Sequence, residues 1–333
     1  MRPFICFLFL LSACAPSPAP AQAARFPAGR CINMANALNA PNEGDWTYRI
    51  EQSHIEMVAQ AGFDSIRVPI AWSAHAAHVA PYSIEPEFFT RIDQVISQAF
   101  DNDLMFILDV HNFEALNENP ARETPRMRAI WQQIAWHYAN APDGLVFELL
   151  NEPMGKMKGR RWEKLMRQLI ADIRQTNPDR WLIVGGDNWN SLDGLARLDA
   201  PYDRRLVLTY HDYEPYEFTH QGASWFKNPP PVGTSWGTAK EQAELRARAA
   251  RAARIRDKTG MPVWLGEFGS HQKAPAASRV RWTKAMRHAL AAEDIGWCAF
   301  DFAAEFSFWS PATQSWNRDL LDALLGDQME LRQ

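Results

Sequence analysis

The chain has 333 residues, of which 47% are hydrophobic and 22% are charged, so it is not a mainly disordered protein. Its length is sufficient for one α/β barrel. The 35 Lys and Arg residues against 39 Asp and Glu give a net charge of −4, which offers no basic surface to a phosphate backbone, and we expect no nucleic-acid partner.

Residues 1–24 are predicted to be an export leader followed by a tether. Arg2 precedes an apolar run, residues 4–11, that is too short to anchor the chain in a bilayer. Ala-Gln-Ala at 21–23 fits a signal-peptidase site, whereas Leu-Ser-Ala-Cys at 11–14 resembles a bacterial lipobox that would leave Cys14 lipidated. We favour the lipobox, because the Pro-, Ala- and Ser-rich segment that follows is typical of a flexible tether. We therefore expect an exported protein, periplasmic or on the outer membrane or cell surface, whose only membrane contact is this lipid. Cleavage at the signal-peptidase site would instead give a secreted protein.

From residue 25 onward, short apolar runs alternate with longer helical patterns, which predicts repeated βα units. Eight strands are expected, at 31–34, 65–69, 105–109, 146–150, 181–184, 206–210, 263–266 and 296–300. They are mostly apolar throughout, as is typical of parallel strands covered on both faces. Helical spacing predicts helices around Ile55 and Val58 with Gly62 as terminator, from Phe88 to Ala99, from Trp162 to Ile173, and over 239–257.

This order predicts a single (β/α)8 TIM barrel that occupies residues 25–333 as one domain. An open doubly wound sheet is the competing fold, but it usually carries a glycine-rich phosphate turn after its first strand, and the sequence has no GxGxxG. Outside the leader, two cysteines remain, Cys31 and Cys298. They form either a disulfide or two buried thiols. Since the first and eighth strands of a barrel are neighbours, the fold favours the disulfide.

Reactive side chains follow the carboxyl ends of the predicted strands, where a barrel places its active site. They are Arg67, His111, Asn151, Glu152, His211, Tyr213 and Glu267. Each of them alone has an ordinary structural explanation, such as a core ion pair or a hydrogen-bonded histidine. Their occurrence at successive strand ends favours a shared site.

Glu152 and Glu267 follow the fourth and seventh strands and are expected to face each other across the barrel. Cleavage of a glycosidic bond with retention needs two carboxyl groups about 5–5.5 Å apart, one that protonates the leaving oxygen and one that attacks the anomeric carbon. Arg67 and Tyr213 are expected to donate to Glu267 and keep it ionised, and Asn151 to bind the sugar 2-hydroxyl.

Six segments resemble glycoside hydrolase family five, the cellulase family, and they follow its order over nearly the whole mature chain. They are 33–46 (NMANALNAPNEGDW), 62–72 (GFDSIRVPIAW), 108–113 (LDVHNF), 147–153 (FELLNEP), 208–222 (LTYHDYEPYEFTHQG) and 262–269 (PVWLGEFG). The resemblance implies that Glu152 is the acid/base and Glu267 the nucleophile. It also implies a polar shell around the −1 sugar, made of Arg67, His111, Asn151, His211 and Tyr213.

The resemblance further implies action on β-1,4-linked glucans, such as cellulose or mixed-linkage β-glucan, without a metal or other cofactor. One position departs from the family pattern. Phe300 stands after the eighth strand where the family usually has a Trp beneath the −1 sugar, and a phenyl ring offers less area and no N–H donor. Trp297 or Trp309 is a candidate to compensate, and Trp225 and Trp236 are expected to form further sugar subsites.

Three alternatives to this function remain. A metal-dependent hydrolase would use His111, His211 and the carboxylates, but no HExxH or comparable spacing is present. A non-catalytic glucan-binding lipoprotein is expected to have lost a catalytic carboxylate, and both are retained. A related glycosidase acting on mannan, xyloglucan or β-1,3-glucan stays open. Our prediction is a monomeric, endo-acting retaining β-glucanase.

Overall fold

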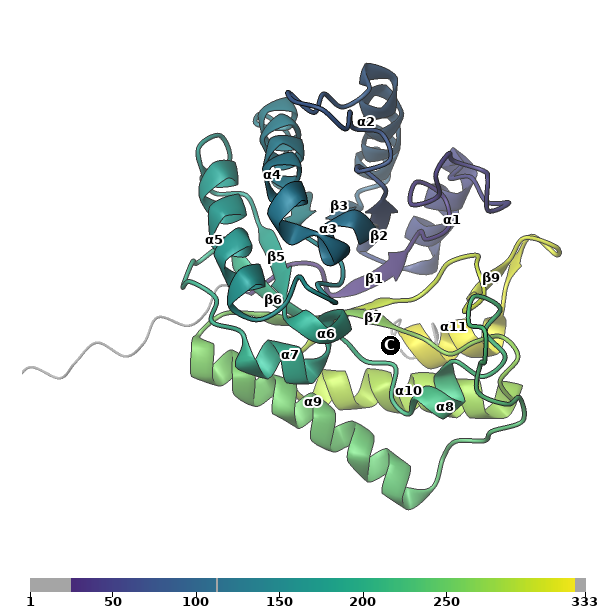
Figure 1. Cartoon of the computed structure of the whole chain (residues 1–333). Helices are drawn as coiled ribbons and strands as arrows, with labels where there is room; N and C mark the ends of the chain where they lie inside the picture. Colours follow the sequence, from purple (N-terminus) through teal and green to yellow (C-terminus); the bar gives the residue numbers. More distant parts are fainter. Residues whose placement is uncertain (1–24, 112, 327–333) are drawn as a thin grey trace, which may run out of the picture.

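The computed structural model describes residues 25–111 and 113–326, and eight parallel strands close into a barrel in chain order, with helices around it (Figure 1). The strands are β1 (Arg30–Asn33), β2 (Ser65–Ile70), β3 (Met105–Val110), β4 (Leu145–Glu148), β5 (Leu182–Gly185), β6 (Leu206–His211), β7 (Val263–Phe268) and β8 (Gly296–Ala299). Each predicted strand overlaps one of these. The predicted TIM barrel is therefore confirmed.

Helices follow the strands along the chain, and the longer ones surround the barrel (Figure 1). The helices are α1 (Gln52–Ala61), α2 (Pro86–Phe100), α3 (Glu114–Glu118), α4 (Pro120–His137), α5 (Arg160–Arg174), α6 (Asp187–Asn190), α7 (Leu192–Arg197), α8 (Tyr216–Thr219), α9 (Ala239–Thr259), α10 (Ala276–Ala292) and α11 (Arg318–Leu325). A short hairpin, β9 (Trp309–Ser310) with β10 (Ser315–Trp316), precedes α11.

The four predicted helices are confirmed as α1, α2, α5 and α9, and their ends follow the local sequence. Gly62 ends α1 with a φ of 98°, a left-handed conformation that glycine adopts without strain. Thr238 and Glu241 form a reciprocal capping box at the start of α9. Sequence patterning missed α4 and α10, and Pro125 inside α4 is a residue that usually argues against a helix.

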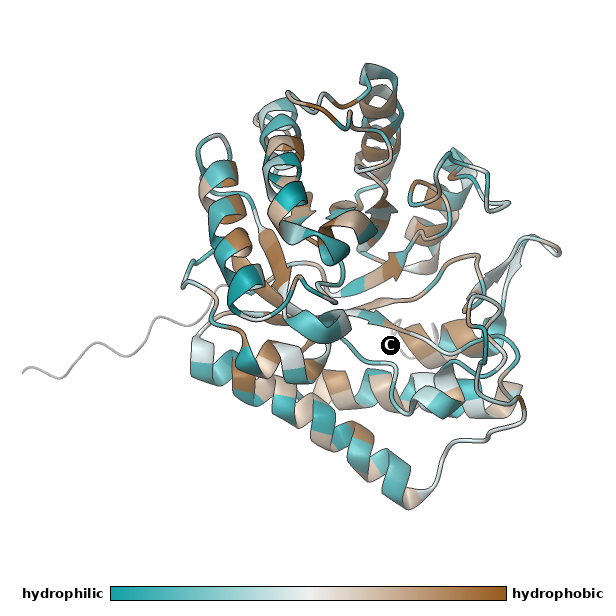
Figure 2. Cartoon of the chain, in the orientation of Figure 1, coloured by the Kyte–Doolittle hydropathy of each residue, from teal (hydrophilic) through white to brown (hydrophobic). Residues whose placement is uncertain are grey.

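The strands are largely hydrophobic, whereas the surrounding helices alternate between hydrophobic and hydrophilic stretches (Figure 2). Inside the barrel, the side chains form two layers, because residues two apart on a strand point the same way. The lower layer is apolar and includes Cys31, Ile107, Val146, Ile183, Val207, Trp264 and Cys298. The layer above it, nearer the active-site end, is polar and includes Asn33, Arg67, Asp109, Glu148 and Thr209, all fully buried.

Cys31 and Cys298 form a disulfide that joins the first strand to the last. The two residues are direct partners in the parallel register of β1 and β8. Both belong to the apolar lower layer of the barrel. The disulfide favoured from the sequence is therefore present.

The predicted leader, with its lipobox and Cys14, lies outside the described residues. Within the described parts of the chain, none of the helices combines the length and apolar character needed to cross a membrane.

Candidate active site

A cleft of about 780 Å³ lies over the carboxyl ends of the strands and gathers most of the predicted site residues. Those that line it are His111, Asn151, Glu152, His211, Tyr213, Trp225, Glu267 and Phe300. Arg67 is fully buried and contacts Glu267 and Asn151 from within the barrel. Of the predicted site residues, only Trp236 lies elsewhere.

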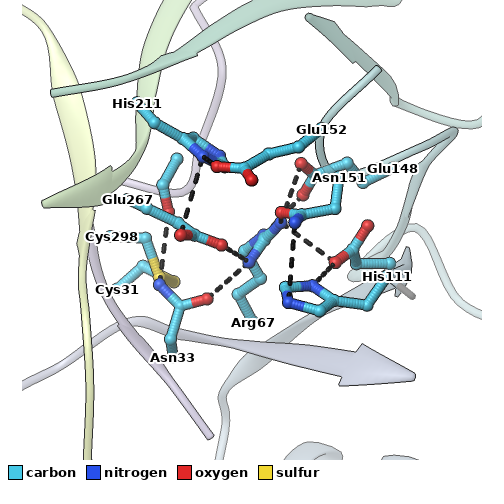
Figure 3. A network of polar contacts seen from close by, with 12 residues as sticks. Cys31, Asn33, Arg67, His111, Glu148, Asn151, Glu152, His211, Glu267 and Cys298 are labelled. Carbon is cyan, nitrogen blue, oxygen red and sulfur yellow. Dashed lines mark hydrogen bonds and ion pairs between the residues drawn. A yellow bond between two sulfur atoms is a disulfide. The ribbon is translucent and has the colours of Figure 1, made fainter. Parts of the chain in front are cut away.

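Glu152, in the loop after β4, and Glu267, in β7, meet at His211. The Nδ1 atom of His211 lies 2.8 Å from Glu152 Oε1 and 3.6 Å from Glu267 Oε2 (Figure 3). One oxygen of each glutamate and this nitrogen all lie within 4.8 Å of one another, a spacing that a metal ion could also use. The His211–Glu152 hydrogen bond accounts for part of this closeness without an ion.

The environments of the two glutamates differ. The side chain of Glu267 is only 5% exposed, whereas that of Glu152 is 27% exposed. Burial opposes ionisation of Glu267, but the charges of His211, Arg67 and His111 and the Tyr213 hydrogen bond outweigh it and lower the pKa of Glu267 to about 2. Glu267 is therefore an anion, and Glu152 is open to proton exchange with the cleft.

Two donors fix the Glu267 carboxylate from opposite oxygens. Arg67 Nη1 donates to Oε1 at 2.7 Å, and the Tyr213 hydroxyl donates to Oε2 at 2.8 Å. Burial lowers the pKa of His211, but two neighbours more than offset this effect. The charge of Glu267, together with the hydrogen bond and charge of Glu152, raises the pKa of His211 above its usual value. Positive or donor groups thus surround the anion, as predicted for Arg67 and Tyr213.

Arg67 connects Glu267 to the polar layer of the barrel (Figure 3). Its Nε and Nη2 atoms donate to the two oxygens of Glu148 at 2.6 and 3.0 Å. Nη2 also approaches Asp109 Oδ2 at 3.0 Å and Asn151 Oδ1 at 2.7 Å, and Nη1 donates to Asn33 Oδ1 at 2.7 Å. The guanidinium therefore contacts side chains from β1, β3 and β7, the last residue of β4, and Asn151 just beyond it.

Three carboxyl groups face this one guanidinium, so their charges are not balanced by Arg67 alone. Burial, the largest influence, raises the pKa of Glu148 despite Arg67, and this favours its neutral form. Asp109 has a second hydrogen-bond partner besides Arg67, since His111 Nδ1 lies 2.6 Å from Asp109 Oδ2. Sequence reasoning missed Glu148 and Asp109 as members of the site, although a carboxylate inside an apolar strand is a signal that could have found them.

The tautomer of His111 follows from its partners. Asn151 Oδ1 accepts from Arg67, so the amide Nδ2 is the atom that faces His111 Nε2, at 3.5 Å. An amide nitrogen only donates, so in the neutral form of His111 the Nε2 atom accepts and Nδ1 carries the proton toward Asp109. This series of hydrogen bonds, from Arg67 through Asn151 and His111 to Asp109, orients the amide of Asn151 beside the two catalytic candidates.

Two glycines allow the strands to approach one another beneath the site. A Cβ at Gly266 would lie 2.7 Å from Thr209 Oγ1, and one at Gly269 would lie 2.0 Å from the backbone oxygen of Phe300. The register of β7 with β8 shifts between Leu265 and Phe268, which aims the intervening Glu267. The peptide bond from Phe300 to Asp301 is cis.

Aromatic rings form one wall of the cleft. Phe300 lies 6.3 Å from Tyr213 and 5.8 Å from Phe306, measured between ring centroids. Phe306 is in turn 5.7 Å from Trp225, whose side chain is half exposed. Phe300 thus lines the cleft, and its nearest aromatic support is Phe306, which the sequence reading did not identify.

The expected contributions of three other tryptophans are not borne out by their positions. Trp236 is 3% exposed, and its backbone is held by Ser278 and Arg281 of α10, away from the cleft. Trp297 packs against Phe268 and Trp309 stacks on Phe302, so neither compensates for Phe300 at the cleft surface. Burial of these large apolar rings stabilises the core and removes them from contact with a ligand.

The cleft is also lined by residues that sequence reasoning missed. Trp189 is one of them and is 56% exposed, with a positive φ at both Asn188 and Trp189. Arg251 and Asp193 also line the cleft and form an ion pair. An exposed indole in a left-handed loop conformation is unusual for a packing residue and is consistent with a ligand-contacting role.

Comparison with known proteins decides the family. The model of the cellulase family, glycosyl hydrolase family 5, matches residues 30–305. The chain belongs to glycosyl hydrolase family 5. The family and the glycoside hydrolase class expected from the motifs are therefore confirmed.

Three relatives illustrate the similarity. Endoglucanase H of Acetivibrio thermocellus is 29% identical over 89% of this chain, which spans only 32% of that relative's length. Cel5A of Thermotoga maritima, solved with cellobiose, is 35% identical with a TM-score of 0.88, covering 90% of this chain and 97% of that one. The cellulose synthase subunit Z of Clostridioides difficile is 33% identical with a TM-score of 0.87, covering 89% and 99%.

Proposed function

We propose that this family 5 member is a retaining endo-β-glucanase that hydrolyses β-1,4-linked glucan with Glu152 as acid/base and Glu267 as nucleophile. The observation that carries the proposal is the approach of the two carboxyl groups, with one oxygen of each within 4.8 Å. Retaining glycosidases need carboxyl groups about 5–5.5 Å apart, whereas inverting ones leave room for a water at about 6.5–9.5 Å.

In the first step, Glu152 donates its proton to the glycosidic oxygen while an oxygen of Glu267 attacks the anomeric carbon. The bond to the leaving sugar breaks, and a covalent glycosyl–Glu267 ester forms. In the second step, ionised Glu152 takes a proton from water, which attacks the same carbon and releases Glu267. The greater exposure of Glu152 suits its two proton transfers.

The neighbouring groups support these steps from fixed positions. Arg67 and Tyr213 hold Glu267 ionised and aimed. Arg67 and His111 orient Asn151, which supports its proposed hydrogen bond to the sugar 2-hydroxyl. Phe300 lines the cleft, which supports its proposed stacking against the −1 sugar. His211 lies between the two glutamates and helps to fix both. No step of this mechanism requires a metal or another cofactor.

Cellulose or mixed-linkage β-glucan is the proposed substrate, since relatives named as endoglucanases cover most of this chain. A mannan-type substrate is the second candidate. The Thermotoga maritima enzyme has been solved with mannotriose as well as with cellobiose, so its site accepts both kinds of sugar.

Activity of the purified protein on cellulose, barley β-glucan, mannan and xylan tests the proposal, with the anomer of the first product followed by NMR. We expect β-glucan to be cleaved best, with chain-internal cleavage and an initial β-anomer. Release of the α-anomer would overturn retention. Glucan binding without release of sugar from any substrate would favour the non-catalytic alternative.

We also propose that the protein is exported and anchored through Cys14, in the periplasm or on the outer face of the envelope. The disulfide between Cys31 and Cys298 supports an oxidising compartment. Membrane fractionation of wild type and Cys14→Ser tests this proposal. We expect the wild type in the membrane fraction and the variant released. The monomeric state stays a prediction, to be checked by sedimentation.

A further inference from the structure

Glu305, in the loop after β8, connects the three loops that border the aromatic wall of the cleft. Its side chain accepts from the Ser224 hydroxyl and, at 3.3 Å, from the Ser224 backbone N–H, in the loop after β6. It also lies 2.6 Å from His271 Nε2, in the loop after β7. The backbone oxygen of Glu305 accepts from Gln272 at 2.8 Å.

His271 is fully buried, and its tautomer follows from its partners. The backbone N–H of Lys273 donates to His271 Nδ1 at 3.1 Å, so Nδ1 accepts and the proton is on Nε2, which donates to Glu305. Partial burial opposes ionisation of Glu305, but the hydrogen bonds from Ser224 and His271 lower the pKa of Glu305 below its usual value. The carboxylate is therefore a charged acceptor for donors from two loops.

The loop that carries Glu305 is itself fixed from inside the fold. Buried Asp301 accepts from the backbone N–H groups of Ala304 and Phe306, at 2.5 and 3.3 Å. Arg279, from α10, donates to the backbone oxygens of Phe306 and Ser307, at 3.0 and 3.3 Å. Glu305 therefore lies in a segment whose backbone N–H groups are bonded to Asp301 and whose backbone oxygens are bonded to Arg279.

The residue that follows Ser224 is Trp225, which is half exposed and lines the cleft with both catalytic candidates. Its ring lies 5.7 Å from Phe306 and 5.9 Å from His271, and no helix or strand holds its backbone. The hydrogen bonds from Ser224 to Glu305 are thus made by the residue immediately before this ring.

We propose that Glu305 is a positioning residue that holds Trp225 against the cleft wall, so that Trp225 binds a sugar unit in a fixed orientation. This rests on the proposed function. Within the described residues, the side chain of Glu305 bonds to Ser224 and His271 and not to Glu152 or Glu267, so it acts through those two residues. Its removal is therefore expected to weaken substrate binding more than it slows the chemical step.

A double-mutant cycle on β-glucan oligosaccharides tests the proposal. We expect Glu305→Ala and Trp225→Ala each to raise KM by about tenfold with a smaller change in kcat, and the double variant to resemble Trp225→Ala alone. Ser224→Ala, which keeps the His271 contact, should show a smaller rise. Glu217→Gln, which changes an exposed carboxylate in the same loop, should match wild type.

Additive effects of Glu305→Ala and Trp225→Ala on KM would overturn the proposal, as would a loss confined to kcat. If Glu305→Ala does not fold, Glu305→Gln in the same cycle gives the deciding measurement, since its amide keeps one acceptor oxygen. Inactive wild-type protein would refute the proposed function instead, and thermal unfolding of each variant separates a loss of folding from a loss of binding.

Discussion

The hydroxyl of Tyr213 donates a hydrogen bond to Glu267 Oε2 at 2.8 Å, on the oxygen opposite the one that Arg67 contacts. A donor to the ionised form of a carboxyl group stabilises the anion and lowers its pKa. The lowered pKa of Glu267, about 2, means that acid does not protonate this carboxylate until well below pH 4.

Tyr213→Phe removes this donor, so the pKa of Glu267 should rise and the acid limb of kcat/KM should move to higher pH. We expect a shift of about one pH unit, since a hydrogen bond to a charged group contributes roughly 1.5–3 kcal/mol. The measurement is kcat/KM from about pH 1.5 to pH 7, so that the acid limb of both proteins is covered, with folding checked at each pH. Exposed Tyr202→Phe serves as the control. An unchanged acid limb would show that Tyr213 does not tune the nucleophile.

Glu267→Gln should abolish turnover, because an amide does not form the glycosyl ester. We expect kcat to fall by about four orders of magnitude or more, as for the loss of other catalytic nucleophiles. Exposed Glu118→Gln provides a control of the same chemical change. Wild-type rates in Glu267→Gln would mean that another residue is the nucleophile.

Glu152→Ala should respond differently, because the acid/base is needed twice. An aryl glycoside with a good leaving group needs little protonation, so the first step should persist while hydrolysis of the glycosyl ester becomes slow. Added azide should restore turnover and yield a β-glycosyl azide, detectable by mass spectrometry and NMR. If azide does not restore turnover and Glu152→Ala still hydrolyses natural substrates at the wild-type rate, Glu152 is not the acid/base.

Phe300→Ala should weaken glucan binding, because it removes the ring at the position proposed to stack on the −1 sugar. An aromatic contact contributes about 0.5–1.5 kcal/mol beyond its buried area, so kcat/KM should fall about tenfold. Phe300→Trp should raise affinity if Phe306 leaves room for the larger ring. Kinetics and the Tm of both variants measure this. An unaltered kcat/KM in Phe300→Ala would show that the sugar lies elsewhere.

Removal of the disulfide should destabilise the fold without changing the site. Cys31 and Cys298 are 267 residues apart, and a cross-link that closes a long loop stabilises by about 2–5 kcal/mol. Denaturant unfolding of wild type, with and without reductant, and of the Cys31→Ala/Cys298→Ala variant measures the loss. Equal stability of all three forms would contradict this prediction.

The barrel and most of the site could be predicted because strand ends bring residues distant in the sequence to one place. The strand order alone was enough to predict that Glu152 and Glu267 lie close together. Trp225 and Trp236, by contrast, occur in similar loop sequences, and only the packing of α10 over Trp236 separates the buried ring from the exposed one. Glu148 lies within an apolar strand, and its contact with Arg67 depends on which way that strand's side chains face.

The five N–H groups of Arg67 are shared among five acceptor side chains, and one of these is Glu267, the proposed nucleophile. A small displacement of any neighbouring strand would thus shift the guanidinium and, through it, the Glu267 carboxylate. Efforts to redirect this enzyme toward other glycans are best confined to the outer loops, since sequence changes beneath the guanidinium would disturb specificity and turnover together.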